Sequence, residues 1–185
     1  ATTPDDYLGD VIGDINSSLI INMAIFITGA RKGLGRYFTE AFLKEGCRVI
    51  GCSRGDSDLV HESYTHYECD VANEKSVIQL VREVGKQGIK IEALINNAGV
   101  ASMNHILSTT TQRSIDLLNT NFVGTLNCTR EVAKHMLLRK IKGKVINFSS
   151  VAAPLGLEGE AVYASSKSAV EKLTQITAKE LAHLG

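Results

Sequence analysis

The chain has 185 residues, the length of one domain. Lysine plus arginine and aspartate plus glutamate each number 20, so the net charge is zero, which excludes a globally basic nucleic-acid-binding protein. Apolar residues make up 44% and charged residues 22%, which excludes a disordered chain because such a composition can fill a core. No apolar run reaches the ~18 residues of a membrane span, so we do not expect a membrane as partner. The zero net charge leads us not to expect a nucleic acid as partner either.

Cysteine and histidine spacing argues against disulfides and metal. The cysteines, at 47, 52, 69 and 128, are too few and too scattered for a disulfide framework. Neither a CxxC motif nor an HExxH pair occurs, so a metal site is not expected. The N-terminus has no basic region of the kind that begins a signal peptide. We therefore expect buried free thiols and a cytoplasmic protein.

Residues 1–22 differ in charge from the rest of the chain. They hold four acids and no base, so residues 23–185 carry a net charge of +4. Apolar residues recur at helical spacing between positions 8 and 19, but two glycines would weaken such a helix by roughly 1 kcal/mol each. Met23 begins the first strand-like run. We interpret 1–22 as an N-terminal extension and 23–185 as the domain.

From Met23 onward, short apolar runs alternate with helical patterns. Asn73 is a good N-cap for the second helix, and Gly46 and Gly88 follow two of the helices as C-terminal glycines do. The alternation predicts an α/β fold, a three-layer doubly wound parallel sheet of the Rossmann type. The expected strands are 24–28, 48–52, 64–69, 91–95 and 144–148, and the expected helices are 34–45, 74–86, 112–138 and 161–184.

The turn between the first strand and first helix reads TGARKGLG at 28–35. A strand–turn–helix junction rich in glycine lets a nucleotide pyrophosphate approach the backbone and the helix N-terminus. Gly29 would permit the tight turn, Gly33 the approach of the phosphates and Gly35 the packing of helix on strand. The alternative is a plain tight turn. It is not a P-loop, because no Gly-Lys-Ser/Thr follows.

The end of the second strand indicates which dinucleotide is preferred. An acid about 20 residues after the glycines reads the ribose 2′-hydroxyl of NAD, but the chain has Arg54 there. Arg54, joined by Arg31 or Lys32, can pair with the 2′-phosphate of NADP. We therefore expect NADPH or NADP as cofactor, with NAD less favoured. The alternative is that Arg54 is an ordinary solvated charge.

Tyr163 and Lys167 form Y-x-x-x-K on the last helix, with both side chains on one face. A nearby ammonium lowers the pKa of a phenol from its usual value of about 10, which suits proton transfer. Ser150 lies 13 residues before Tyr163, just after a strand, and ligand sites gather at the carboxyl ends of parallel strands. Ser149, the preceding residue, is the alternative candidate for the serine of this site.

Together these motifs resemble those of the classical short-chain dehydrogenase/reductase family. Within that family, the chain as a whole is most similar to the 3-oxoacyl-acyl-carrier-protein reductases. The resemblance spans 28–167, most of the chain. It is carried by TGARKGLG at 28–35, the run Cys69, Asp70 and Val71, NNAG at 96–99, Asn121 within NTNFVG, Ser150 within NFSSV and YASSK at 163–167.

The resemblance implies a nicotinamide cofactor, hydride transfer and a role for each matching residue. Tyr163 resembles the general acid/base, Lys167 its partner that also holds the nicotinamide ribose, Ser150 the residue that binds the substrate carbonyl, and Asn121 the residue whose helix kink serves a proton relay. Asp70 resembles the adenine contact. The implied cofactor-binding residues are Gly29, Arg31, Lys32, Gly33, Leu34, Gly35, Arg54, Asp70, Val71, Asn97, Ala98, Gly99, Tyr163 and Lys167.

The family usually continues past the last helix into further strands and a substrate lid, so we expect 23–185 to be C-terminally incomplete relative to it. The resemblance implies a ketone substrate, either a small molecule or a 3-oxoacyl group on a carrier protein. Bases cluster at 134, 139, 140, 142 and 144, where such reductases dock an acidic carrier; the alternative is a solvated basic helix end. A sugar, polyol or steroid ketone stays open. We also expect a homodimer or homotetramer. The rival hypothesis is a catalytically inactive nucleotide-binding or interaction protein.

Overall fold

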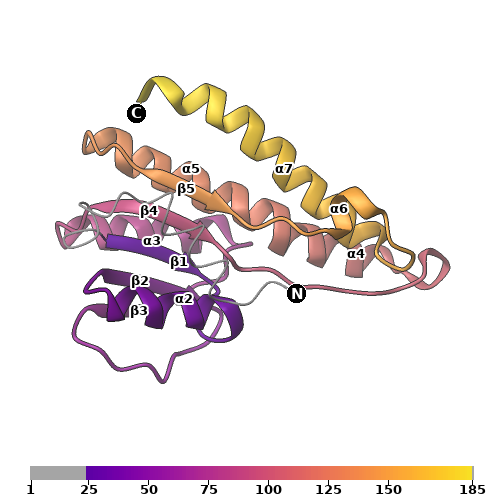
Figure 1. Ribbon diagram of the computed structural model, residues 1–185, viewed down its shortest axis with the longest axis horizontal. Coiled ribbons are helices and arrows are strands. Elements are labelled where there is room, and N and C mark those ends of the chain that lie inside the picture. Colours follow the sequence, from indigo (N-terminus) through magenta and orange to yellow (C-terminus); the bar gives the residue numbers. More distant parts are fainter. Residues whose placement is uncertain (1–23, 185) are drawn as a thin grey trace.

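The computed structural model describes residues 24–184, which form a parallel sheet with helices on both faces (Figure 1). The order of the strands in the sheet is β3-β2-β1-β4-β5, with every neighbouring pair parallel. The strands are β1 (Ala24–Thr28), β2 (Arg48–Ser53), β3 (Tyr64–Glu68), β4 (Ile91–Asn96) and β5 (Lys144–Asn147). This order, with β1 at the centre, confirms the predicted doubly wound fold.

The helix between β1 and β2 packs on one face of the sheet, and the helices that follow β3 and β4 pack on the other face. No helix separates β2 from β3 in the described part of the chain. Short 3₁₀ turns, η2 (Ile106–Ser108) and η4 (Ala182–Leu184), and the short helix α6 (Ala152–Leu155) lie in the connections. The longer helices are α2 (Gly33–Lys44), α3 (Glu74–Lys86), α4 (Thr111–Leu118), α5 (Gly124–Leu138) and α7 (Ala161–Leu181).

Alternation along the central strand divides the core into two layers. Ile25 and Ile27 of β1 pack with Phe38 and Phe42 of α2 on one face. Phe26, between them, belongs to the opposite layer, which α3 and α5 cover. All five residues of β1 are buried, as a strand covered on both faces requires. The first layer ends near the glycine-rich turn, so this packing positions the turn at the sheet's carboxyl edge.

The predicted strands and the first two helices agree with the structure to within one residue at each end. The Asn73 side chain accepts a hydrogen bond from the backbone N–H of Ser76, so the predicted N-cap is confirmed. Gly46 follows α2 with a φ of 79°, which favours glycine. The expectation for residues 1–22 lies outside the described residues. Within residues 24–184, no helix combines the length and apolar character needed to cross a membrane.

The predicted single helix over 112–138 is wrong. The structure divides it into α4 and α5, joined by a π-helical turn, η3 (Asn119–Val123). The inserted residue of a π turn rotates the helix face. In α4, before this turn, Ile115 and Leu118 are exposed, while Leu117 is buried. The last helix is also shorter than predicted, since α7 ends at Leu181.

Candidate active site

The glycine-rich turn is held against the end of β4 by Asn97. Its side-chain Nδ2 donates to the carbonyl oxygens of Thr28 (3.0 Å) and Gly29 (3.3 Å). The hydroxyl of Thr28 accepts from the backbone N–H groups of Asn97 and Ala98, at 3.1 and 2.9 Å. A Cβ at Gly35 would collide with the Gly29 carbonyl, so only glycine lets α2 start this close to β1. Gly35 thus has the packing role that was predicted.

The N-terminus of α2 suits an anion. Its N-cap residue, Lys32, provides no side-chain hydrogen bond to the first turn, so the first backbone N–H groups are not satisfied by a cap. Gly33 has a φ of 60°, and no described atom lies within 4 Å of the position that a Cβ would take. Uncapped N–H groups beside an open backbone fit a pyrophosphate group.

This turn forms one wall of a cleft of about 510 Å³ at the carboxyl ends of β1, β2 and β4. Its lining includes most of the predicted cofactor residues: Gly29, Arg31, Lys32, Gly33, Leu34, Arg54, Asp70, Val71, Asn97, Ala98 and Gly99. Gly35, Tyr163 and Lys167 are not among the lining residues. The lining also includes Ser53, Gly55, Cys69, Val100 and Thr120, which were not predicted, although each is a chain neighbour of a predicted residue.

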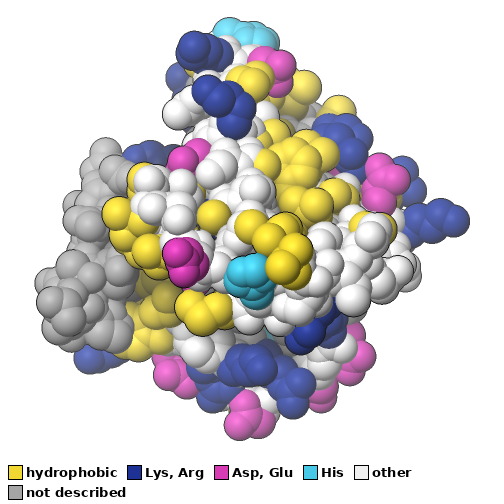
Figure 2. Space-filling model, turned by 90° about the vertical axis from the view of Figure 1, so that its right-hand side faces the viewer, with side chains coloured by type: hydrophobic (Ala, Val, Ile, Leu, Met, Phe, Trp, Pro, Cys, Tyr) yellow, Lys and Arg dark blue, Asp and Glu magenta, His cyan; other side chains and the backbone are white. Residues whose placement is uncertain are grey.

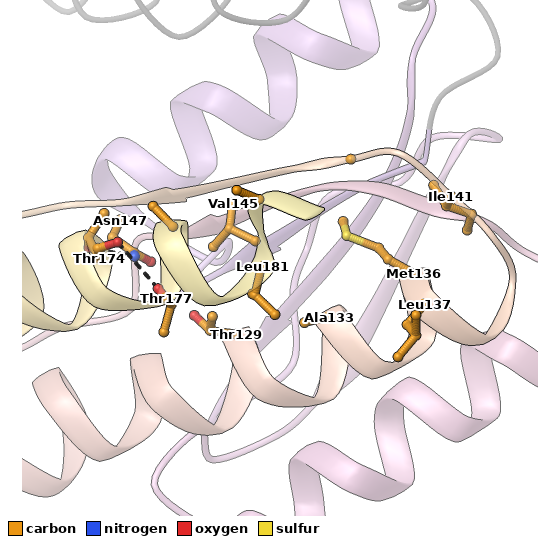
Figure 3. A pocket seen from close by; sticks show the side chains of 13 residues that line it. Thr129, Ala133, Met136, Leu137, Ile141, Val145, Asn147, Thr174, Thr177 and Leu181 are labelled. Atoms are coloured by element: carbon orange, nitrogen blue, oxygen red, sulfur yellow. Dashed lines mark hydrogen bonds between the residues drawn. The ribbon is translucent and has the colours of Figure 1, made fainter. Parts of the chain in front are cut away.

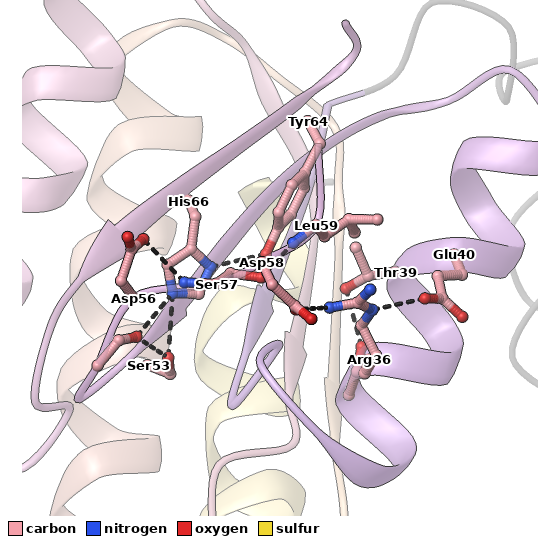
Figure 4. Close-up of polar contacts among 12 residues, drawn as sticks. Arg36, Thr39, Glu40, Ser53, Asp56, Ser57, Asp58, Leu59, Tyr64 and His66 are labelled. Carbon is pink, nitrogen blue, oxygen red and sulfur yellow. Dashed lines mark hydrogen bonds and ion pairs between the residues drawn. The ribbon is translucent and has the colours of Figure 1, made fainter. Parts of the chain in front are cut away.

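Two arginines, Arg31 and Arg54, lie in the cleft near the end of β2. The Arg31 guanidinium is 2.8 Å from where a Cβ on Gly55 would be, so it lies directly against that glycine. A third base, Arg36, is engaged elsewhere: it pairs with Glu40 at 2.5 Å and Asp58 at 2.6 Å (Figure 4). The hydrogen bond to Glu40 has the largest effect on the pKa of Arg36, followed by the one to Asp58, and both raise it. The two cleft arginines fit a phosphate on the adenosine ribose.

The opposite end of the cleft meets the π-helical turn. Asn121 in this turn is 1% exposed. Its Oδ1 accepts from the backbone N–H of Val100 (2.8 Å), and its Nδ2 donates to the Val100 carbonyl (2.9 Å) and to the Ser166 hydroxyl (3.0 Å). The predicted helix kink at Asn121 is therefore present as a π turn, and it connects the loop after β4 to α7. Sequence reasoning missed Ser166, which is fully buried.

Lys167 of α7 reaches the same place. Its Nζ donates to the Phe148 carbonyl at 2.8 Å, and the residue is 8% exposed. A Cβ placed on Gly99 would lie 3.3 Å from Asn121 Oδ1 and 3.7 Å from Lys167 Nζ. Burial lowers the pKa of Lys167. The structure thus brings Lys167, Asn121 and Gly99 together, and Gly99 joins this group to the cleft.

The two candidate serines after β5 point to different partners. Ser149 Oγ donates to Glu171 of α7 at 2.6 Å, whereas Ser150 Oγ accepts from the backbone N–H of Ala152 at 3.2 Å. The Ser150 hydroxyl proton therefore stays available to an acceptor. Half-buried Tyr163 lies one helical turn before Lys167, on the same face of α7. Within residues 24–184, no hydrogen bond joins Ser150 to Tyr163 directly.

A second hollow, of about 250 Å³, lies between α5, β5 and α7 (Figure 3). Its labelled side chains include Met136, Val145 and Leu181, and a hydrogen bond joins Asn147 to Thr174 at its rim. It is mainly apolar and contains none of the predicted site residues. The chemistry-bearing groups therefore gather at the carboxyl edge of the sheet and not here.

A family model described as short chain dehydrogenase matches residues 23–185. The 3-oxoacyl-acyl-carrier-protein reductase FabG of Staphylococcus epidermidis is 31% identical over 176 residues, covering 89% of this chain and 71% of the relative. The L-xylulose reductase of Caenorhabditis elegans is 35% identical over 168 residues, covering 85% of this chain and 65% of the relative.

Solved structures agree with this match. A structure of ElxO with NADP bound is 31% identical, with a TM-score of 0.82 over 89% of this chain and 70% of that one. A 4-hydroxyisoleucine dehydrogenase complexed with NADH is 27% identical, with a TM-score of 0.83 over 88% of this chain and 71% of that one. The chain belongs to the short chain dehydrogenase family of oxidoreductases, which use a nicotinamide dinucleotide.

Proposed function

We propose that the protein reduces a ketone to a secondary alcohol with NADPH. The observation that carries this proposal is the meeting of Lys167, Asn121 and Gly99, because it joins an anion-binding cleft to the helix that bears Tyr163. A dinucleotide extended along the cleft from Arg54 would end at this meeting point. The carbonyl of a substrate would then face Tyr163 and Ser150.

A nicotinamide bound at this end of the cleft would supply the hydride. The Ser150 hydroxyl donates to the substrate carbonyl oxygen and holds it, and the Tyr163 hydroxyl gives that oxygen its proton. The Lys167 ammonium stabilises the phenolate that remains and binds the nicotinamide ribose. Asn121 keeps the loop after β4 and α7 in register, and the π turn around it helps return a proton to Tyr163 through water.

The preference for NADPH rests on Arg31 and Arg54, since both lie in the cleft and neither forms an ion pair in the part of the chain described. We expect Arg54→Asp to weaken NADPH binding far more than NADH binding. An equal loss for both cofactors in a fluorescence titration would contradict the preference.

An apolar rim beside Ser150 favours a substrate with an apolar chain, such as a 3-oxoacyl thioester. Hydrophobic side chains gather on this face of the molecule (Figure 2). Two segments build the rim and are joined by the hydrogen bond from the Asn104 N–H to the Gly159 carbonyl (2.7 Å). Their exposed large apolar side chains are Met103, Ile106, Leu107, Val151, Leu155 and Leu157. A sugar would gain little from such a rim.

The basic cluster proposed to dock an acidic carrier protein is smaller than the sequence suggested. Lys134 pairs with Glu131 at 2.8 Å, and Arg139 donates to the Gly85 carbonyl. Lys140, Lys142 and Lys144 stay exposed and carry this part of the proposal. We further propose a cytoplasmic homodimer or homotetramer that assembles through α5 and α7. A sedimentation velocity run at micromolar concentration that gives a monomer would contradict the assembly.

The deciding experiment compares the protein with Tyr163→Phe in NADPH oxidation against a panel of ketones that includes a 3-oxoacyl thioester. Loss of the acid/base should lower turnover by about 10²–10⁴-fold. NADPH binding should stay nearly unchanged, because the ring still packs. Binding of NADPH without turnover of any ketone by the unaltered protein would favour the alternative, an inactive nucleotide-binding protein.

A further inference from the structure

A histidine on the edge strand holds the loop that carries Arg54. His66 of β3 lies across from Gly51 in β2. Its Nε2 is 3.0 Å from the Ser53 hydroxyl and 3.1 Å from the Gly55 carbonyl (Figure 4). These two residues flank Arg54 on either side, and all three line the cleft. His66 itself is outside the lining and was not singled out by any motif.

The contacts determine which ring nitrogen carries the proton. A carbonyl oxygen only accepts, and the Ser53 hydroxyl already donates to the Gly55 carbonyl at 2.6 Å. Nε2 must therefore be the N–H nitrogen, and it donates to this pair of oxygens. Nδ1 is then free to accept, and the Tyr64 hydroxyl lies 2.7 Å from it. A chain of hydrogen bonds thus runs from Tyr64 through His66 to the Gly55 backbone.

The same chain touches the glycine-rich turn. A Cβ on Gly51 would collide with the Tyr64 hydroxyl and approach the Ala30 Cβ to 2.8 Å, so the phenol sits over Gly51 beside that turn. At the other end, the Arg31 guanidinium lies against Gly55. Holding the Gly55 backbone in place therefore supports the Arg31 guanidinium, which lies against Gly55, and the turn that carries Arg54.

We propose that His66 is the positioning residue that sets the preference for a 2′-phosphorylated dinucleotide, by locking the turn of Ser53, Arg54 and Gly55. The inference rests on the proposed use of NADPH. It assigns the discrimination between NADPH and NADH to His66, which does not itself line the cleft. His66 acts only through Arg54 and Arg31, so its removal should affect the binding of NADPH and not that of NADH.

The test measures dissociation constants for NADPH and NADH by fluorescence titration. In His66→Asn, the shorter amide no longer reaches the Gly55 carbonyl, and the NADPH constant should rise about tenfold, the cost of one part-buried hydrogen bond. The NADH constant should change less than about twofold. His66→Gln places an N–H donor near the original Nε2 and should restore most of the NADPH affinity.

Three further variants separate this role from general damage. His61→Asn makes the same change in the loop before β3, at a residue whose side chain accepts from the Ser63 N–H, and should leave the ratio of the constants unchanged. Tyr64→Phe removes only the hydroxyl that orients the ring and should shift the ratio in the same direction by a smaller factor. In a background with both Arg54→Ala and Arg31→Ala, His66→Asn should have no further effect on the ratio.

The outcomes are distinguishable. A protein that prefers NADPH and keeps that preference in both His66→Asn and Tyr64→Phe overturns the inference and leaves the proposed function standing. Equal weakening of both cofactors also overturns it, because it shows a structural role. If the unaltered protein has no preference for NADPH, the proposed cofactor use fails first, and the inference falls with it.

Discussion

The side chain of Asn121 forms two hydrogen bonds with the backbone of Val100, accepting from its N–H at 2.8 Å and donating to its carbonyl at 2.9 Å. The same amide donates to the Ser166 hydroxyl, which in turn donates to the Tyr163 carbonyl at 2.7 Å. One buried amide thus ties the loop after β4 to the first turns of α7. This tie fixes the distance between the cofactor cleft and the helix that bears Tyr163.

Removing the hydrogen bonds of Asn121 should lower the stability of the fold. We expect Asn121→Ala to lower the free energy of unfolding by about 2–3 kcal/mol, because it removes two part-buried hydrogen bonds to the Val100 backbone and a buried one to the Ser166 hydroxyl. Asn119→Ala, two residues earlier in the same π turn and exposed, should cost less than about 0.5 kcal/mol. Urea unfolding followed by circular dichroism compares the two, and similar costs would show that Asn121 does not carry the connection.

The two serines offer a matched pair. Ser150→Ala should reduce turnover of a ketone by about 10²–10³-fold, the usual cost of losing a donor to the reacting oxygen. Ser149→Ala should leave turnover within about threefold, because Ser149 bonds to Glu171 on α7 and its loss costs only an exposed contact. If NADPH oxidation assays show that Ser149→Ala lowers turnover more than Ser150→Ala, Ser149 is the residue that binds the substrate carbonyl.

Cys69 should be the most reactive of the four free thiols, all of which are buried. Hydrogen bonds from Cys52 and, secondarily, from the Ser76 hydroxyl at 3.3 Å lower the pKa of Cys69 to about 7. Burial raises the pKa of Cys47 to about 11 and that of Cys128 still further. Iodoacetamide at pH 7.5 should therefore modify Cys69 first.

NADPH should slow this modification, because Cys69 lines the cleft. Peptide mass spectrometry after timed alkylation, with and without NADPH, measures both effects. Cys69→Ser is the control that should abolish the fastest phase of labelling. Faster labelling of Cys47, or a rate at Cys69 that NADPH does not alter, would contradict the position of Cys69 in the cofactor site.

The strands and the glycine-rich turn could be predicted because they depend on local patterns. Continuous apolar runs mark strands covered on both faces, and Asn73 caps α3 through its own side chain. The pattern of apolar residues did not predict the π turn at 119–123, because these residues continue at steps of three and four across it. An inserted residue changes which of them are buried without changing their spacing. Only the family resemblance implied a kink at Asn121.

The residues that support the site were missed for a different reason. Ser166 and His66 act through contacts with residues 45 and 11 positions away. His66 belongs to no motif, and Ser166 lies within YASSK, where only Tyr163 and Lys167 were assigned roles. Ser53 and Gly55 could have been found from their position beside Arg54. A motif indicates which residues face a ligand, whereas the residues that hold them in place depend on the packing of separate elements.

Acid should destabilise the protein through His135, which is 3% exposed and accepts a hydrogen bond from the Ile91 N–H at its Nε2 (3.2 Å). Burial, with a smaller effect of Arg139, lowers the pKa of His135 to about 4 from 6.5. Between these values the unfolded chain binds a proton that the folded protein does not. The free energy of unfolding is therefore highest above pH 6.5 and falls as the pH drops toward 4, by about 2–3 kcal/mol from this group.

His135→Gln isolates this effect, since its side-chain oxygen can accept from Ile91 and does not titrate. We expect urea unfolding at pH 7.5, 6.5, 5.5 and 4.5 to show a steeper loss of stability in the unaltered protein than in His135→Gln. All other ionisable groups are the same in both proteins, so their contributions cancel in the difference. Parallel curves would show that folding does not change the pKa of His135 and would contradict the effect assigned to its burial.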